Sequence, residues 1–302
     1  MLRIYLKLFL TAVLWGGTFV AGRMLAGRIP PCSAAFLRFA VASCLLFFLT
    51  WRMEGRWPAV SRSQILPLFL LGMTGIFSYN IFFFKGLERI SAGRAALIIA
   101  LNPIFITLCS GLFFRERLTP LKLLGVLISV TGAVIVISRG SLGAILGEGL
   151  GWGEVYILFC VVSWVAFSLI GKAVLSGITP LVSVTYASGV GALALFVPAC
   201  LEGMVPQLGE YPPIVWANVI YLGLFGTVIG FIWYYEGIRA IGPTRAGLFI
   251  NFVPVSAILL AFWILDEPVT LSLLLGALLV ACGVCLTNLQ LGAPPRPAVT
   301  PR

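Results

Sequence analysis

RAALIIALNPIFITLCSGLFFRE, at residues 94–116, is a hydrophobic run that carries charges only at its two ends and a proline near its middle. The same design returns 151 residues later as RAGLFINFVPVSAILLAFWILDE, at residues 245–267. The offset joins three pairs of landmark residues: Arg94 with Arg245, Pro103 with Pro254, and Glu116 with Glu267. About 20 apolar residues in a helix cross a bilayer core of about 30 Å, so each stretch predicts a membrane helix.

A proline inside a membrane helix changes the backbone around it. It removes one helical hydrogen bond and leaves the carbonyl four residues back without its usual donor. Hydrocarbon offers no replacement, so protein, water or ligand must satisfy that carbonyl. We therefore predict helix kinks at Pro103 and Pro254 and, with Asn102 and Asn251 close by, a polar region near the middle of the membrane. The alternative is that both prolines only bend their helices for packing.

The composition of the whole chain is that of a membrane protein. Of its 302 residues, 60% are hydrophobic and 10% are charged, whereas soluble domains carry about 25% charged residues. The net charge of +10 comes from basic residues scattered singly between apolar runs, which indicates topology signals and argues against a nucleic-acid partner. The lipid bilayer is therefore the expected partner.

Hydrophobic runs separated by short loops predict an all-α membrane protein with ten transmembrane helices. The predicted spans are 4–24, 32–51, 65–85, 94–113, 120–138, 152–173, 180–201, 214–237, 245–264 and 268–288. Lys and Arg are divided unevenly between the alternating loops, with 13 on the side of the N-terminus and 6 on the other when Arg38 is left out. The positive-inside rule then places both termini in the cytoplasm. We expect a multi-pass protein of the bacterial cytoplasmic (inner) membrane.

Two offsets relate the first half of the sequence to the second. At 149, Trp15 meets Trp164, and at 151, Gly72 meets Gly223 and Gly86 meets Gly237. Each half contains five spans, an odd number, so the second half must enter the membrane in the opposite sense. Such an inverted repeat is the plan of many secondary transporters. The predicted divisions are a first repeat at 1–139, a Gly-rich extracytoplasmic linker at 140–151, a second repeat at 152–289 and a disordered cytoplasmic tail at 290–302.

Several motifs resemble one transporter family. LWGGTFVAGR at 14–23 and AAFLRFAVA at 34–42 resemble the opening of EamA-domain proteins of the drug/metabolite transporter superfamily. YYEGIRAIGPTRAGLFINFVPV at 234–255 and LDEPVT at 265–270 resemble the second EamA domain. The resemblance implies ten helices in two inverted halves, both termini inside, and ion-driven export of amino acids, nucleosides or amphipathic toxic compounds. It also implies a central cavity lined mainly by the first, third, fourth, sixth, eighth and ninth helices, and it does not fix the substrate.

Polar and aromatic residues near mid-depth are candidates for binding the substrate. Trp15 and Trp164 lie away from the interfaces where tryptophan usually sits, which favours a place on the cavity wall. An asparagine left unpaired in hydrocarbon costs about 1–3 kcal/mol, so the asparagines should face the bundle interior. The candidates are Trp15, Thr18, Tyr79, Asn80, Asn102, Trp164, Ser168 and Asn251. Packing between helices is the alternative role for these residues.

Three charged residues in or beside spans are candidates for gating or ion coupling. Lys85 and Glu236 are related by the offset of 151, and each follows an aromatic run. Snorkelling to the interface is the alternative for both, because each lies near a helix end. Arg38 is the charge deepest in any predicted span, and ionisable groups inside a membrane are functional candidates by default. The family resemblance also implies an arginine here, which favours an interior structural or gating role.

Glycines seven residues apart mark one face of the fifth and tenth predicted helices. They are Gly125 with Gly132, and Gly276 with Gly283. Small residues on one face let two membrane helices approach closely. We therefore predict that these helices pack the two halves against each other within one chain, and that the protein is a monomer.

Other functional classes fit the sequence less well. A membrane-embedded enzyme needs a nucleophile, an acid–base pair or a metal site, and the chain has no histidine. We therefore predict no enzymatic activity, no cofactor and no metal. A nucleotide-sugar or sugar-phosphate exchanger on the same fold is a second transporter alternative, but it should need two or more basic residues facing the cavity. The preferred function is a secondary exporter of small metabolites (amino acids or related amphipathic compounds) that alternates access around a midplane cavity, with a proton as the candidate coupling ion.

Overall fold

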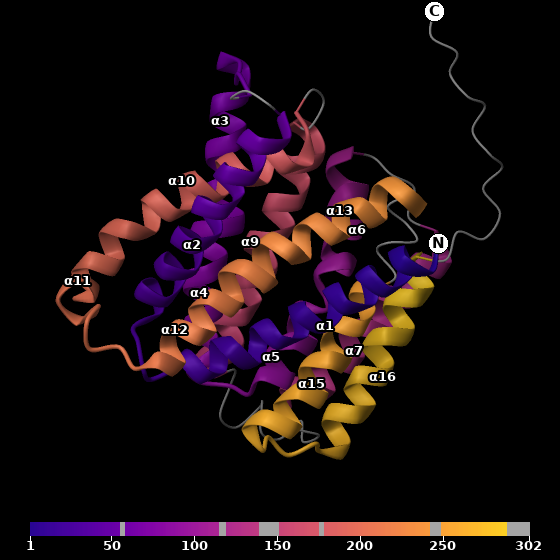
Figure 1. Cartoon of the computed structure of the whole chain (residues 1–302). Coiled ribbons are helices and arrows are strands. Elements are labelled where there is room, and N and C mark those ends of the chain that lie inside the picture. Colours follow the sequence, from indigo (N-terminus) through magenta and orange to yellow (C-terminus); the bar gives the residue numbers. More distant parts are fainter. Residues whose placement is uncertain (55–57, 115–118, 139–150, 175–177, 242–248, 289–302) are drawn as a thin grey trace, which may run out of the picture.

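The computed structural model describes residues 1–54, 58–114, 119–138, 151–174, 178–241 and 249–288, and every regular element in those ranges is a helix (Figure 1). The first half contains α1 (Leu2–Leu25), α2 (Pro31–Glu54), α3 (Arg62–Leu71), the π-helix η1 (Gly72–Ser78), α4 (Tyr79–Leu87), α5 (Ala92–Ile99), α6 (Asn102–Phe114) and α7 (Pro120–Ile137). The second half contains α9 (Trp152–Val174), α10 (Pro180–Leu201), α11 (Met204–Gln207), α12 (Pro213–Ile220), the π-helix η2 (Tyr221–Ile229), α13 (Gly230–Ile241), the 3₁₀ turn η3 (Phe249–Asn251), α15 (Phe252–Leu265) and α16 (Leu271–Asn288).

The described helices fall into two groups by length and hydropathy. Seven of them are long and apolar enough to cross a membrane: Leu2–Leu25, Pro31–Glu54, Arg62–Leu87, Pro120–Ile137, Trp152–Gly171, Pro180–Leu201 and Pro213–Tyr234. Three further apolar helices are shorter, at Ala92–Ile106, Phe249–Leu265 and Leu271–Leu286. Each of the ten predicted spans overlaps one of these helices, and seven of the ten have the length of a complete span.

The stretch at residues 94–116 differs from the single kinked helix predicted for it. Helix α5 ends at Ile99 and α6 begins at Asn102, so that the chain breaks before Pro103 and does not bend around it. Pro103 therefore lies in the first turn of α6, where the missing N–H has no helical acceptor to lose. Pro254 likewise lies in the first turn of α15. Glu116 and Arg245 lie outside the described residues, as do residues 140–150 of the predicted linker (140–151) and the predicted tail at 290–302.

Helices α7 and α16 lie side by side and join the two halves of the chain (Figure 1). A Cβ atom built on Gly132 would lie 2.8 Å from the carbonyl oxygen of Gly276, and one built on Gly276 would lie 2.8 Å from that of Gly132. Gly283 meets the backbone of Gly125 in the same way. The Ser129 hydroxyl adds a hydrogen bond of 3.1 Å to the Val280 carbonyl. This seam confirms that the two pairs of glycines pack the halves together.

Other close contacts occur in pairs that the two sequence offsets exchange. Gly72 packs against Val190 of α10, and its counterpart Gly223 packs against Val41 of α2. Adding 151 to Gly72 gives Gly223, and adding 149 to Val41 gives Val190. Two further exchanged pairs are Gly86 on Ile157 with Gly237 on Leu8, and Gly75 on Phe167 with Gly226 on Thr18. The repeat seen in the sequence is therefore also a repeat of tertiary contacts.

Acidic residues that follow one helix satisfy the N-terminus of another. Glu202, after α10, accepts backbone N–H bonds from Cys32 (3.2 Å) and Ser33 (2.9 Å) at the start of α2. Glu267, after α15, accepts from Ala92 (2.9 Å) and Gly93 (3.3 Å) at the start of α5. A carboxylate at a helix C-terminus opposes the dipole of its own helix, but here it meets the positive N-terminus of a neighbour and its unpaired N–H groups.

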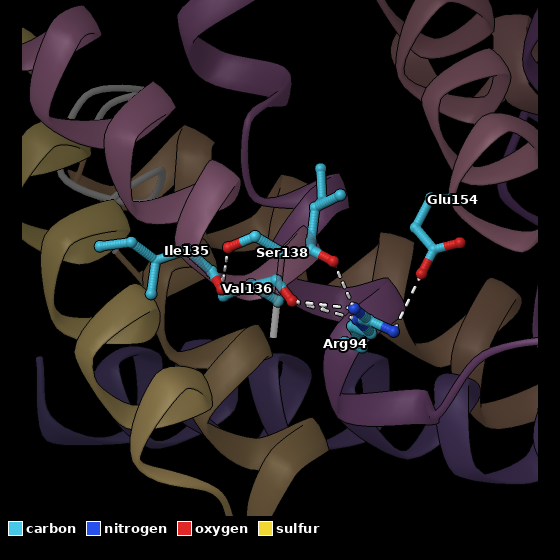
Figure 2. A network of polar contacts seen from close by, with 6 residues as sticks. Arg94, Ile135, Val136, Ser138 and Glu154 are labelled. Atoms are coloured by element: carbon cyan, nitrogen blue, oxygen red, sulfur yellow. Dashed lines mark hydrogen bonds and ion pairs between the residues drawn. The ribbon is translucent and has the colours of Figure 1, made fainter. Parts of the chain in front are cut away.

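Arg94 forms the matching contact at a helix C-terminus (Figure 2). Its guanidinium donates to the carbonyls of Val136 (3.0 Å) and Ile137 (2.6 Å) at the end of α7. It also makes an ion pair of 2.9 Å with Glu154 at the start of α9, and both side chains are less than a tenth exposed. Arg94 thus connects α5 to α7 and α9. Although a positive charge at the start of α5 is unfavourable for the dipole of α5, it lies at the negative C-terminal end of α7, where it is favourable.

Candidate functional site

Arg38 is the centre of a polar cluster inside the bundle. It lies on α2, and only 9% of it is exposed. Its Nη1 donates to the Asn80 Oδ1 of α4 at 3.1 Å, and its Nε and Nη2 both donate to the Thr227 Oγ1 of η2 at 3.4 Å. The guanidinium carbon also lies 5.1 Å from the centre of the Phe39 ring. The cluster therefore joins two helices of the first half to one element of the second.

The two acceptors of Arg38 are held in place by π-helical segments. The Asn80 Nδ2 donates to the Ile76 carbonyl of η1 at 2.7 Å, which turns the Oδ1 of the same amide toward Arg38. The Thr227 hydroxyl donates to the Leu222 carbonyl of η2 at 2.9 Å and so presents its lone pairs to Arg38. The wider turn of a π-helix disturbs the regular backbone pairing, and such segments are frequent at functional sites.

Trp15 packs beside this cluster on the α1 side. Its indole Nε1 donates to the Gly226 carbonyl at 3.0 Å, one residue before Thr227. Its ring centre lies 5.7 Å from that of Phe231 and 5.3 Å from that of Tyr234. The Thr18 hydroxyl donates to the Trp15 carbonyl at 2.6 Å, so this threonine is satisfied within its own helix.

Trp164 occupies the corresponding position on α9. Its ring centre lies 5.4 Å from that of Tyr79, the neighbour of Asn80, and 5.2 Å from that of Phe167. The Ser168 hydroxyl donates to the Trp164 carbonyl at 2.7 Å. The two tryptophans are thus linked, through residues adjacent in sequence, to the two acceptors of Arg38. Six of the eight predicted binding residues belong to this set of contacts: Trp15, Thr18, Tyr79, Asn80, Trp164 and Ser168.

The two asparagines next to the helix breaks stand apart from the Arg38 cluster. Asn102 is 7% exposed, and its Oδ1 is a buried acceptor that no described donor reaches. Asn251 ends the 3₁₀ turn before α15 and is half-buried. The described residues give neither asparagine a hydrogen bond to Arg38, so the structure does not join them to the other candidates.

Lys85 lies near the end of α4, as predicted, whereas Glu236 lies in the middle of α13, which continues for five residues beyond it, so the predicted position near a helix end is wrong for Glu236. Each of the two side chains contacts a neighbouring helix. Glu236 of α13 makes an ion pair with Lys7 of α1, and its side chain is 44% exposed. Lys85 of α4 lies with its Nζ 5.9 Å from the centre of the Tyr156 ring of α9. Adding 149 to Lys7 gives Tyr156, and adding 151 to Lys85 gives Glu236. Equivalent positions of the two halves are therefore bridged by an ion pair in one case and a cation–π contact in the other.

The sequence did not single out Thr227, the acceptor that brings the second half to Arg38. A threonine in a hydrophobic run is an ambiguous signal, because its hydroxyl can bond to the backbone of its own helix. The counterpart of Thr227 at the offset of 151 is Ile76, which is apolar, so the repeat carries no hint either. Only the approach of η2 to α2 reveals its role.

Comparison with known families identifies the fold. The model of the EamA-like transporter family matches residues 2–138 and 151–289, which is nearly the whole chain in two units. The chain belongs to the EamA-like transporter family. It is therefore a multi-pass membrane protein of the drug/metabolite transporter superfamily, and all regular elements in its described residues are helices. The EamA chain is also similar over 95% of its length to a solved crystal structure, with a TM-score of 0.62 and 20% identity, which supports the fold alone.

Relatives of this EamA chain are transporters by name. It is 29% identical to the uncharacterized transporter YyaM of Bacillus subtilis, over 94% of this chain and 92% of that protein. It is 31% identical to a probable terminal-alkyne amino-acid exporter of Streptantibioticus cattleyicolor, over 97% of this chain and 96% of the relative. It is 28% identical to the uncharacterized inner membrane transporter YedA of Escherichia coli, over 100% of this chain and 96% of the relative.

Proposed function

We propose that this EamA protein is a secondary transporter that exports amino acids or related amphipathic metabolites by alternating access around a mid-membrane cavity. The family supports transport of a small molecule across the bilayer. The relative named as a probable terminal-alkyne amino-acid exporter, at 31% identity over nearly the full length of both chains, supports the substrate class and the direction.

The exchange of contacts between the two halves is the observation that carries this proposal. Gly72 packs against Val190, and the residues at the equivalent positions of the other half, Gly223 and Val41, pack against each other in the same way. Such an exchange is what a two-fold axis between two five-helix units produces, and we propose that it lies in the membrane plane between residues 1–139 and 152–289. An axis in that plane exchanges the two sides of the membrane, so that the same kinds of contact can close either mouth of a shared cavity.

Polar contacts between helices support the ten-span topology. Contacts on the predicted cytoplasmic side join Lys7 to Glu236 and Glu54 to Thr179. Contacts on the predicted outer side join Glu202 to Ser33, Glu267 to Ala92 and Arg94 to Glu154. Each contact joins two residues assigned to the same side. We propose both termini in the cytoplasm of a bacterial inner membrane, and a monomer whose α7–α16 seam is internal.

Transport of a defined substrate panel tests the proposal. In inside-out vesicles that contain the protein, an exporter should take up a subset of radiolabelled amino acids, nucleosides and lipophilic cations. We expect neutral amino acids to accumulate above the level in vesicles without the protein. Uptake equal to that of the empty vesicles for every amino acid would contradict the proposed substrate class.

Trp15→Ala and Trp164→Ala are each expected to lower the initial rate of transport about tenfold or more, with most of the folded protein retained. Aromatic surface in a small-molecule site contributes binding energy that alanine cannot replace, and tenfold corresponds to about 1.4 kcal/mol. Initial rates in proteoliposomes check this, after each variant is normalised to its monodisperse yield.

Trp15→Phe is the matched control, because it keeps the ring contacts to Phe231 and Tyr234 and removes only the N–H bond to Gly226. It should retain most of the transport. A fall in folded yield that parallels the fall in rate would instead assign both tryptophans to packing.

Glu236→Gln is expected to separate transport from a pH gradient if protons drive export. Glu236 is half-exposed and pairs with Lys7 across α1 and α13, and the amide of glutamine cannot bind and release a proton as a carboxylate can. Substrate exchange without a gradient should continue in the variant, while the stimulation by an imposed pH gradient should disappear. Lys7→Gln, which keeps the carboxylate, is the control. Full stimulation of Glu236→Gln by the gradient would remove Glu236 from the coupling step.

A further inference from the structure

Arg38 differs from the two basic residues that form ion pairs between helices among the described residues. Arg94 is paired with Glu154, and Lys7 with Glu236. The partners of Arg38 are an amide oxygen and a hydroxyl, both neutral, and the described residues contribute no carboxylate to it. A buried guanidinium is costly unless it is paired with an anion and fully hydrogen-bonded. The cluster thus contains a positive charge that the described protein does not neutralise.

Two N–H groups of Arg38 remain available after its hydrogen bonds to Asn80 and Thr227. A guanidinium has five N–H groups, and Arg38 makes three bonds to Asn80 and Thr227. One N–H therefore remains on each terminal nitrogen. Two N–H groups on a planar guanidinium are suited to the two oxygens of a carboxylate, and such charge-assisted bonds are about twice as strong as neutral ones.

The aromatic residues linked to the cluster indicate that the rest of the ligand is apolar. Trp15 bonds to the residue before Thr227, and Tyr79, the neighbour of Asn80, packs on Trp164. Aromatic surface is thus linked to both acceptors of Arg38. A cationic anchor with aromatic surface beside it is complementary to a molecule that carries an anionic group on an apolar body.

The first half has the buried arginine Arg38, and the second half has no basic residue at the equivalent position. Adding 149 to Arg38 gives Ala187, so the equivalent place in the second half carries no basic side chain. One guanidinium is suited to one negative charge, whereas a phosphate ester carries about two at neutral pH. The asymmetry also gives a bound molecule a single orientation relative to the two halves.

We propose that Arg38 is the subsite for the carboxylate of the transported molecule, and that Asn80 and Thr227 position its guanidinium. This inference rests on the proposed function, since it takes the substrate to be a small amphipathic metabolite. It narrows that class to monocarboxylates with an apolar side group, for which the amino group is not required at this subsite. A structural role, in which Arg38 only joins α2, α4 and η2, predicts no such preference.

Ligand-induced thermal stabilisation of the purified protein in lipid nanodiscs tests the proposal with four matched probes. L-Phenylalanine and 3-phenylpropanoate carry a carboxylate, phenethylamine carries only the amine, and phenyl phosphate carries a phosphate dianion. The two carboxylates should raise the melting temperature in a saturable manner, with phenethylamine and phenyl phosphate much weaker. Arg38→Gln should lower the affinity for both carboxylates about tenfold to a hundredfold, the equivalent of a hydrogen bond to a charged group.

Arg23→Gln is the matched control, because Arg23 of α1 donates to the Leu87 carbonyl and lies outside the cluster. It should leave the order of the four probes unchanged. If Arg38→Gln yields no folded protein, Thr227→Val provides the second variant, since it frees the guanidinium without removing it. That variant should weaken carboxylate binding and leave the weak response to phenethylamine as it is.

Three results would overturn the subsite: no stabilisation of the wild-type protein by either carboxylate, equal stabilisation by phenethylamine, or an unchanged carboxylate preference in Arg38→Gln. These results differ from a failure of the proposed function. Vesicles that accumulate a lipophilic cation of the transport panel and none of its amino acids would retain the transporter and exclude the carboxylate subsite. Vesicles that accumulate nothing, with carboxylate-dependent stabilisation intact, would retain the subsite and exclude export.

Discussion

Replacing Glu154 by leucine is expected to lower the free energy of unfolding by about 3–5 kcal/mol, because it removes one partner of a buried ion pair and keeps the charge of the other, Arg94, in the protein interior. Both side chains of this ion pair are less than a tenth exposed, and the pair joins the start of α5 to the start of α9 (Figure 2). The carbonyls of Val136 and Ile137, which also accept from Arg94, carry no full negative charge and cannot take the place of the carboxylate. The midpoint of thermal unfolding in mild detergent measures the effect.

Two comparisons make this prediction specific to burial. Glu236→Gln breaks the other ion pair among the described residues, and because its side chain is 44% exposed the loss should be about 1 kcal/mol or less. The double variant Arg94→Met with Glu154→Leu should recover part of the stability, since it removes both charges together. If Glu154→Leu and Glu236→Gln shift the midpoint equally, the α5–α9 pair contributes no more than a surface contact.

Replacing Gly283 by valine is expected to separate α7 from α16 and to remove most of the folded protein. A Cβ atom at this position would lie 2.6 Å from the backbone nitrogen of Ser129, and a backbone atom cannot turn aside as a flexible side chain does. Overpacking of this kind costs about 1–3 kcal/mol for a modest excess of volume, and a branched side chain in a helix seam exceeds that. The yield of monodisperse protein and its unfolding midpoint measure the loss.

The exchange of contacts between the halves supplies a second test of the same seam. Gly132 is the counterpart of Gly283, and its Cβ would lie 2.8 Å from the Gly276 carbonyl, so Gly132→Val should have a comparable effect. Gly209→Ala is the control, because no heavy atom lies within 4 Å of the added methyl group. A severe loss in one seam variant and none in the other would show that the two crossings are not equivalent.

Much of the fold follows from properties that each segment carries alone. Hydropathy marks the helices, because any backbone that crosses hydrocarbon must satisfy its own hydrogen bonds. The offsets of 149 and 151 relate positions that the tertiary structure then relates by exchanged contacts, as with Gly72 and Gly223. The glycine spacing in α7 and α16 predicts a close seam for the same reason, since only helices with small residues on one face can approach so closely.

The predictions from sequence were wrong or incomplete where the structure depends on how helix ends are arranged. It treated residues 94–113 as one helix kinked at Pro103, whereas the chain breaks at residues 100 and 101 and begins a new helix. It could not explain why Glu267 follows its helix and Arg94 begins another. Each of these charged side chains forms hydrogen bonds with the terminus of a neighbouring helix, and hydropathy contains no information about which helix termini lie next to each other.

The sequence by itself determined that this chain is a helical membrane protein built from two related halves. Its motifs also resembled the EamA family, to which the chain belongs. Only the tertiary structure decided which polar side chains meet. Arg38 and Thr227 are 189 residues apart and are joined because α2 and η2 pack with particular faces toward each other. Those faces depend on the rotation and crossing of whole helices, which are set by the sum of many packing contacts and by no local pattern.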